Sequence, residues 1–221
     1  MTKKMMLLTS AAVLAFAFAA LPAFASAATP ELDFTGGATE PTASVTFGET
    51  KLTDVNGSTT ICTGPNHAII VYRPKTTGHV RILWTNCHSE SGIGCQNGAS
   101  GEIATGELEF HLVYIKGFTK TPGILITSPI FEFKCSIITV KIKGNGFIGH
   151  IGNTCGSKSK SLSLNFTSSA KGVQTYQEFE GSTEKWHLIS KTGSGAEEEA
   201  SEEMGLAPEL EGGVESELTC P

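Results

Sequence analysis

The sequence predicts a single all-β domain, an antiparallel β-sandwich or flattened barrel of about ten to twelve short strands. Apolar and polar side chains alternate in several short runs, as a strand with one buried and one exposed face requires. Turn residues separate the runs, and 25 glycines together with many Ser and Thr favour short strands and tight turns.

The clearest alternation lies between Gly101 and Gly149, and it predicts three ribbons at the centre of the sheet. In each ribbon the apolar residues occupy every second position and share one face of the strand. The three sets are Leu108, Phe110, Leu112 and Tyr114; Phe131, Phe133 and Cys135; and Ile138, Val140 and Ile142.

Further strands are expected on both sides of this stretch. Trp84 shares its face with Val80 and Ile82, which predicts that its side chain lies in the core. Residues 87–100 form a polar, Gly-rich loop. The remaining predicted strands are Ser44–Phe47, Thr59–Cys62, Ala68–Tyr72, His79–Thr85, Ser161–Phe166, Tyr176–Phe179 and Lys185–Ile189.

Residues 1–27 have the three parts of a secretory signal peptide. Lys3 and Lys4 precede the apolar stretch Met5–Leu21, and Ala25-Ser26-Ala27 supplies a cleavage site. The alternative is a membrane anchor, but the apolar run is short for a bilayer, which needs about 20 apolar residues. No later segment approaches that length, so we expect a secreted, extracellular or cell-surface protein without a membrane span after cleavage.

Charge divides the rest of the chain into an N-terminal arm (28–43), a β-sandwich body (44–192) and an acidic tail (193–221). Residues 28–192 carry 14 Lys and Arg against 13 Asp and Glu, whereas the tail carries nine glutamates and no basic residue. No basic cluster suits a nucleic-acid partner. Within the tail, Ala196–Met204 is interpreted as a solvated segment, and Val214–Cys220 alternates like a last edge strand.

Five lysines are expected on and around one hairpin: Lys134, Lys141, Lys143, Lys158 and Lys160. Such a group suits an anionic polymer, a solvated polar face or pairing with the tail glutamates. A further hypothesis is a regulatory tail that covers these lysines until salt or a cationic partner displaces it.

All six cysteines lie in the exported part, and an even count outside the cytosol predicts disulfides. Pairing Cys87 with Cys95 closes a loop, pairing Cys135 with Cys155 ties a hairpin, and Cys62 and Cys220 are then left over. Spacing alone cannot choose among the 15 possible pairings. A zinc site is the rival interpretation, but the short paired spacing of zinc ligands is missing around Cys87, His88 and Cys95.

Two motifs are candidate functional sites. Gly144–Gly149 matches G-x-G-x-x-G, yet Gly152, Asn153 and Cys155 follow where a dinucleotide site needs a helix, so these glycines are interpreted as turn residues. Glu107, Glu109 and His111 share one face of a strand at about 7 Å spacing. They suit a wet sheet face, the two carboxyls of a retaining glycosidase, or a metal site.

Four features together resemble an uncharacterised family of small secreted cysteine-containing proteins from soil actinobacteria. They are TPGILITSP (residues 121–129), KGNGFIGHI (143–151), KGVQTYQEFEG (171–181) and the cysteine order. The resemblance covers most of the chain and implies export and a shared fold, but it assigns no activity and no functional residue. The chain departs from the family pattern at Cys220 and in the glutamate-rich tail.

The sequence therefore favours a non-enzymatic binding or structural module of the cell envelope or medium. It shows no Gly-x-Ser-x-Gly nucleophile elbow, and no cofactor or metal is expected. A cell-wall polymer or another exported protein is the expected partner. The alternative is a secreted carbohydrate-active hydrolase that uses Glu107 and Glu109 as its catalytic pair.

Overall fold

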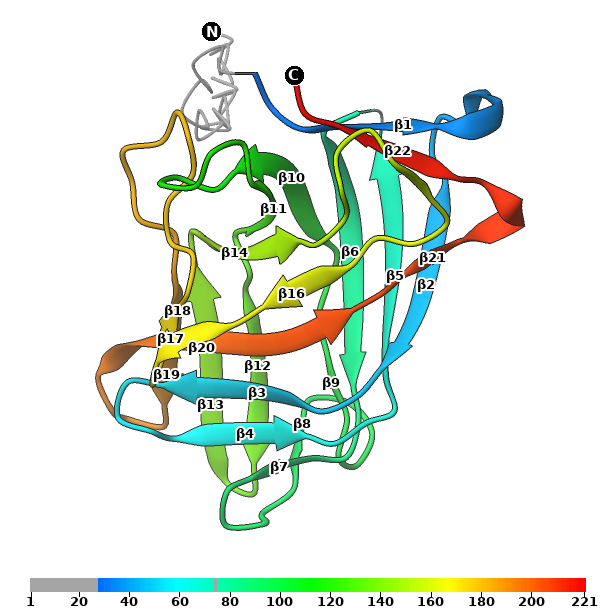
Figure 1. Cartoon of the computed structure of the whole chain (residues 1–221). Helices are drawn as coiled ribbons and strands as arrows, with labels where there is room; N and C mark the ends of the chain where they lie inside the picture. Colours follow the sequence, from blue (N-terminus) through cyan, green and yellow to red (C-terminus); the bar gives the residue numbers. More distant parts are fainter. Residues whose placement is uncertain (1–27, 74) are drawn as a thin grey trace, which may run out of the picture.

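The computed structural model describes residues 28–73 and 75–221, and this part of the chain is all-β (Figure 1). The predicted signal peptide lies outside the described residues. The described chain contains two single 3₁₀ turns, η1 (Thr35–Gly37) and η2 (Glu211–Gly213). The strands are more numerous than the ten to twelve expected, because many of them are short pieces. The strands are β1 (Glu31–Phe34), β2 (Thr42–Phe47), β3 (Thr50–Asp54), β4 (Thr59–Cys62), β5 (Asn66–Arg73), β6 (Thr77–Trp84), β7 (Cys87–Ser89), β8 (Cys95–Gln96), β9 (Ile103–Ala104), β10 (Leu108–Tyr114), β11 (Pro122–Thr127), β12 (Phe131–Cys135), β13 (Ile138–Gly144), β14 (Gly146–Ile151), β15 (Lys158–Ser159), β16 (Leu164–Phe166), β17 (Ser168–Ala170), β18 (Val173–Gln174), β19 (Leu188–Thr192), β20 (Glu197–Leu206), β21 (Glu209–Leu210) and β22 (Ser216–Thr219).

The antiparallel pairings run in two circuits that share β20. The first circuit passes through β2, β5, β6, β10, β11, β14, β16 and β20, and β21 returns it to β2. The second passes through β8, β12, β13, β19, β20, β3, β4 and β7, and a bridge between His88 and Gly94 closes it. We call the second circuit the lower barrel, after its position in Figure 1.

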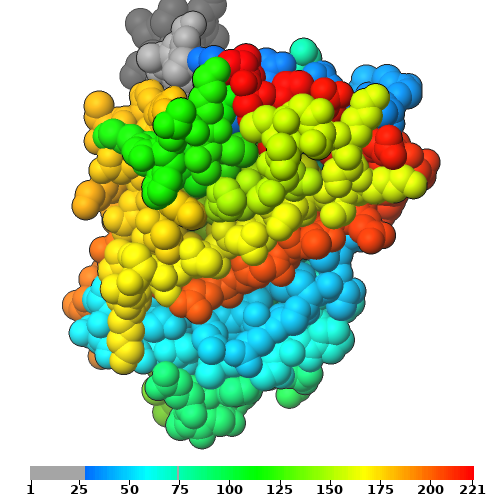
Figure 2. All heavy atoms as spheres, viewed as in Figure 1, coloured from blue at the N-terminus to red at the C-terminus, as the bar shows by residue number. Residues whose placement is uncertain are grey.

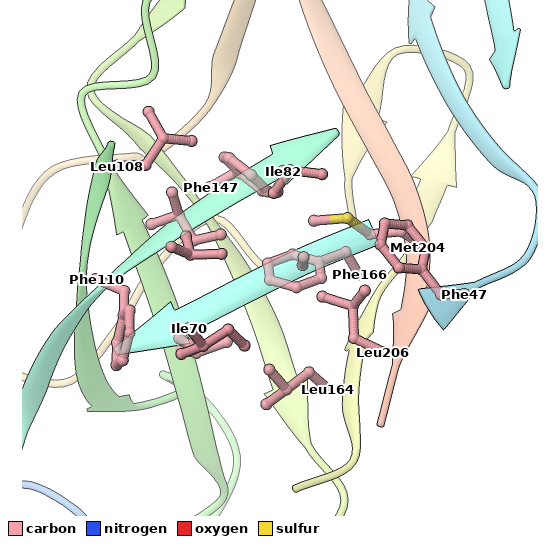
Figure 3. Close-up of a cluster of buried hydrophobic side chains, with 14 of the residues drawn as sticks. Phe47, Ile70, Ile82, Leu108, Phe110, Phe147, Leu164, Phe166, Met204 and Leu206 are labelled. Atoms are coloured by element: carbon pink, nitrogen blue, oxygen red, sulfur yellow. The ribbon is translucent and has the colours of Figure 1, made fainter. Parts of the chain in front are cut away.

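One continuous apolar core fills both circuits, because the strands point alternate side chains inward. Phe110, Phe147 and Phe166 are buried there, and the ring centroids of Phe147 and Phe166 lie 5.1 Å apart (Figure 3). Burying each such side chain stabilises the fold by about 1.5–3 kcal/mol. Trp84 is buried in this core, as its alternation predicted.

A second, smaller core lies on the outer face of β10, β11 and β14. The segment 175–187 covers that face with Phe179 and Trp186, so β11 is buried on both faces. The predicted strand at Tyr176–Phe179 is therefore wrong. Within the described residues, their β pairing consists of isolated bridges, from Tyr176 to Ile148 and from Phe179 to Ile115.

The interpretation of Ala196–Met204 as a solvated segment is also wrong. The chain there forms β20, which lies between β19 on one side and β3 and β16 on the other. Figure 2 shows it as an orange band between the blue strand β3 and the yellow segment that contains β16. Its inward residues are Ala200, Glu202, Met204 and Leu206, while Glu197 on its outer face pairs with Lys143 at 2.8 Å.

Both ends of the described chain meet in a separate three-stranded sheet. The predicted loose arm contains β1, whose Leu32 is buried. The predicted last strand is present as β22, but it pairs with β1 and with β15 and so is not an edge strand. A disulfide from Cys155 to Cys220 holds this sheet to the body.

All six cysteines form disulfides, as predicted, but in other pairs than those suggested by spacing. The bonds join Cys62 to Cys87, Cys95 to Cys135 and Cys155 to Cys220. In the first two, the partners stand directly opposite each other on neighbouring strands. Strand register, which spacing in the sequence does not reveal, decided these pairs.

Candidate functional site

Glu109 and His111 lie on the outer side of β10, and Glu107 lies just before the strand begins. Glu107 pairs with Arg81 at 2.9 Å and with His79 at 3.4 Å, and Glu109 lies 3.5 Å from the His111 ring. Both carboxylates are about half exposed. Burial lowers the pKa of His111, and the charge of Glu109 opposes that shift. The carboxylates are thus paired with neighbours on an open face.

The five lysines do not form one group. Lys134, Lys141 and Lys143 lie on the β12–β13 hairpin, whereas Lys158 begins β15 in the separate three-stranded sheet. Lys141 pairs with Glu132 at 3.2 Å. The regulatory-tail hypothesis is wrong, because the residues that would leave the surface form β20, a strand shared by both circuits.

The segment that matches G-x-G-x-x-G contains a tight turn between two strands. It does not have the strand-to-helix arrangement that a dinucleotide site needs. Gly144 ends β13 and Gly146 begins β14, so no helix follows. A Cβ on Gly144 would lie 2.3 Å from the backbone oxygen of His187, and one on Gly149 would lie 2.7 Å from the Phe166 ring. Glycine is required here because the backbones and rings approach so closely.

The best-formed candidate site is a pocket of about 170 Å³ at one end of the lower barrel. Its walls come from β3, β4, β12, β13, β19 and the loop after β7. Leu52, Ile93, Ile138 and Val140 provide apolar surface, and small hydroxyl residues stand between them. We call it the mouth pocket.

Exposed apolar side chains gather at the rim of this pocket. Ile93 and Ile138, both about half exposed, line it, and Ile137 next to Ile138 is 92% exposed. Val55, also exposed, follows the lining residue Asp54. Large apolar side chains left in water at one opening are typical of a surface that binds something.

A smaller cavity of about 10 Å³ lies deeper in the same barrel. It shares Leu52 and Thr60 with the mouth pocket, so the two spaces are neighbours. Phe131 and Phe133 line it together with two polar side chains, Glu202 from β20 and Trp84 from the end of β6, and we call it the inner cavity.

Glu202 and Trp84 are 4% and 5% exposed. Within the described part of the chain, neither the Glu202 Oε1 atom nor the Trp84 Nε1 atom has a hydrogen-bond partner. Burial raises the pKa of Glu202 well above its ordinary value, and the charge of Glu203 acts in the same direction. Burial thus favours the neutral form of the carboxyl, which offers both an O–H donor and an acceptor oxygen.

Two larger hollows on the surface are less suited to be a site. One of about 560 Å³ lies beside β8 and β12, and one of about 780 Å³ lies beside β2 and β21. Both are more open than the mouth pocket, and polar atoms supply about half or more of the surface of each, whereas the surface of the mouth pocket is mostly apolar.

Sequence reasoning missed Glu202 because it stands in a run of glutamates. The signal was nevertheless present, since Ala200, Met204 and Leu206 alternate around it and place it on the inward face. The mouth pocket left no comparable trace, because six separate segments supply its walls.

No match to this chain was found among protein-family models, curated proteins or solved structures. The resemblance to secreted actinobacterial proteins therefore stays a prediction. Among the described residues, no helix is long and apolar enough to cross a membrane.

Proposed function

We propose that this protein is an exported, non-enzymatic binding module that takes a small apolar molecule into the mouth pocket of the lower barrel. The observation that carries the proposal is the coincidence of an apolar pocket with a rim of exposed isoleucines. Ligand pockets are concave and mostly apolar, with a few polar groups that fix orientation.

The disulfides support both the setting and the rigidity of this site. All six cysteines are oxidised, which is compatible with an exported protein. Cys135, joined to Cys95, lines the mouth pocket, and Cys62, joined to Cys87, lines the inner cavity. The barrel walls are thus cross-linked beside the site, and a preformed pocket loses less entropy when it binds.

A small apolar ligand fits the structure better than a cell-wall polymer does. Sugars stack on exposed aromatic rings, and the described lining of the mouth pocket contains no aromatic side chain. The hydrolase alternative gains nothing specific from the structure, because Glu107 is occupied by Arg81 and His79.

Calorimetric titration of the purified protein with toluene tests the proposal. Saturable binding with one site is expected, with a negative heat-capacity change as apolar surface is buried. Ile138→Asp should weaken it by at least about tenfold, because a charge would face the apolar walls.

Ile69→Asp is the matched control, since Ile69 is also a strand isoleucine about half exposed but lies outside the mouth pocket. It should leave toluene binding unchanged. Absence of saturable binding, or equal effects of the two variants, would contradict the proposal. Incubation with polysaccharides in the same series tests the hydrolase alternative, which requires released sugar that Glu107→Gln abolishes.

A further inference from the structure

Two buried polar atoms belong to residues of the inner cavity, which adjoins the mouth pocket. The indole N–H of Trp84 is a donor without an acceptor, and Oε1 of Glu202 has no donor within the described part of the chain. Both residues line the inner cavity. Leaving two such groups buried and unpaired costs about 1–3 kcal/mol each, so a partner that bonds to both would be strongly favoured.

The inner cavity limits what that partner can be. Its volume of about 10 Å³ accepts one water-sized group. A hydroxyl has this size, and it accepts one hydrogen bond while donating another. It can therefore accept from the Trp84 N–H and donate to Glu202 Oε1 at the same time.

We infer that the lower barrel recognises a compact apolar alcohol, whose hydrocarbon part fills the mouth pocket and whose single hydroxyl is held between Trp84 and Glu202. This inference rests on the proposed function and names its ligand class. Leu52 and Thr60 line both spaces, so the hydrocarbon part and the hydroxyl would meet beside these two residues.

A charged head group fits less well. Besides Glu202, whose neutral form burial favours, the described residues around the inner cavity are Thr, Leu, Trp, Ile, Phe and a disulfide-bonded Cys, so no charge in this lining compensates a buried cation. The charge of Glu203, its neighbour along β20, also raises the pKa of Glu202. Taking an ammonium group out of water costs several kcal/mol, which an imperfect buried ion pair does not recover.

The test compares benzyl alcohol, toluene and benzylamine, which share one hydrocarbon frame. Their binding is followed through the indole N–H resonances of the ¹⁵N-labelled protein, and Trp84→Phe assigns the Trp84 signal. Benzyl alcohol should move the Trp84 N–H resonance as it saturates the site, because the hydroxyl accepts its hydrogen bond. Toluene should bind with little shift at this resonance.

Three variants separate recognition of the hydroxyl from general stability. Glu202→Met keeps the volume and removes the polar atoms, and Trp84→Phe removes the N–H. Each should weaken the binding of benzyl alcohol by about tenfold, because one hydrogen bond is lost, and should leave the binding of toluene nearly unchanged. Glu202→Gln keeps a donor and an acceptor and should retain the preference for the alcohol.

The possible outcomes distinguish this inference from the proposed function. If toluene binds but the variants affect both compounds equally, the cavity holds no ligand hydroxyl and the inference fails while the binding module survives. Tightest binding of benzylamine would overturn the hydroxyl assignment in favour of an ion pair. If no compound binds, both the inference and the proposed function are contradicted.

Discussion

Replacing Glu202 by Gln should change the pH dependence of stability. The carboxyl is 4% exposed, and burial raises its pKa well above the ordinary 4.5, with Glu203 adding to the shift. Between pH 4.5 and the raised pKa, the folded protein keeps a proton that the unfolded chain has released. Stability is therefore greatest below that window and falls as pH rises through it, by about 1.4 kcal/mol per pH unit for one proton.

The Gln variant has no proton to lose, so this slope should disappear from it. The difference in unfolding free energy between variant and wild type should then grow by about 1.4 kcal/mol per pH unit in favour of the variant. Urea unfolding from about pH 4 to about pH 8 measures the slope, and the pH at which the difference levels off gives the folded pKa. Glu202→Met, which also lacks the proton, should show the same change.

Parallel stability curves for wild type and both variants would refute the reasoning. They would mean that the Glu202 carboxyl loses its proton at the same pH in the folded and unfolded chains. The inner cavity would then not shield the carboxyl from water in the way that its burial implies.

Three further results are expected. Gly144→Ala should destabilise the protein by about 1–3 kcal/mol in urea, because its Cβ would meet the His187 oxygen, whereas Gly106→Ala, with open space around it, should lie within about 0.5 kcal/mol of wild type. Replacing both Cys155 and Cys220 by Ala removes a 65-residue linkage and should cost about 4 kcal/mol, seen as a lower midpoint; an unchanged midpoint would show that the bond constrains little. Ending the chain at Gly193 removes β20 and should abolish the cooperative unfolding transition, and a folded truncated protein would contradict the place given to that strand.

Local patterns predicted the strands whose two faces differ. The ribbons at Leu108–Tyr114 and Phe131–Cys135 have the bounds that the sequence predicted, because apolar and polar residues alternate along most of their length. Strand β11 gave no such signal, since both of its faces are buried and its residues show no period. Strand β14 was missed because three of its positions, from Gly146 onward, carry a glycine or a histidine.

The features that the sequence did not predict depend on contacts between distant parts of the chain. A run of glutamates indicated a solvated tail, and only the pairing of β20 with β19 and β3 shows that it is internal. The disulfide partners likewise depend on register between strands. The same holds for the candidate site, because Glu202 and Trp84 are more than a hundred residues apart and meet only in the folded barrel.

The most direct test of the binding site is a methyl-resonance map of the protein titrated with toluene. If toluene binds in the mouth pocket, saturable shifts are expected for the methyl groups that line it, those of Leu52, Ile93, Ile138 and Val140. No shift is expected at the exposed Ile69. Shifts confined to other surfaces, or no saturable shift at any methyl group, would contradict the claim that the lower barrel is a binding site.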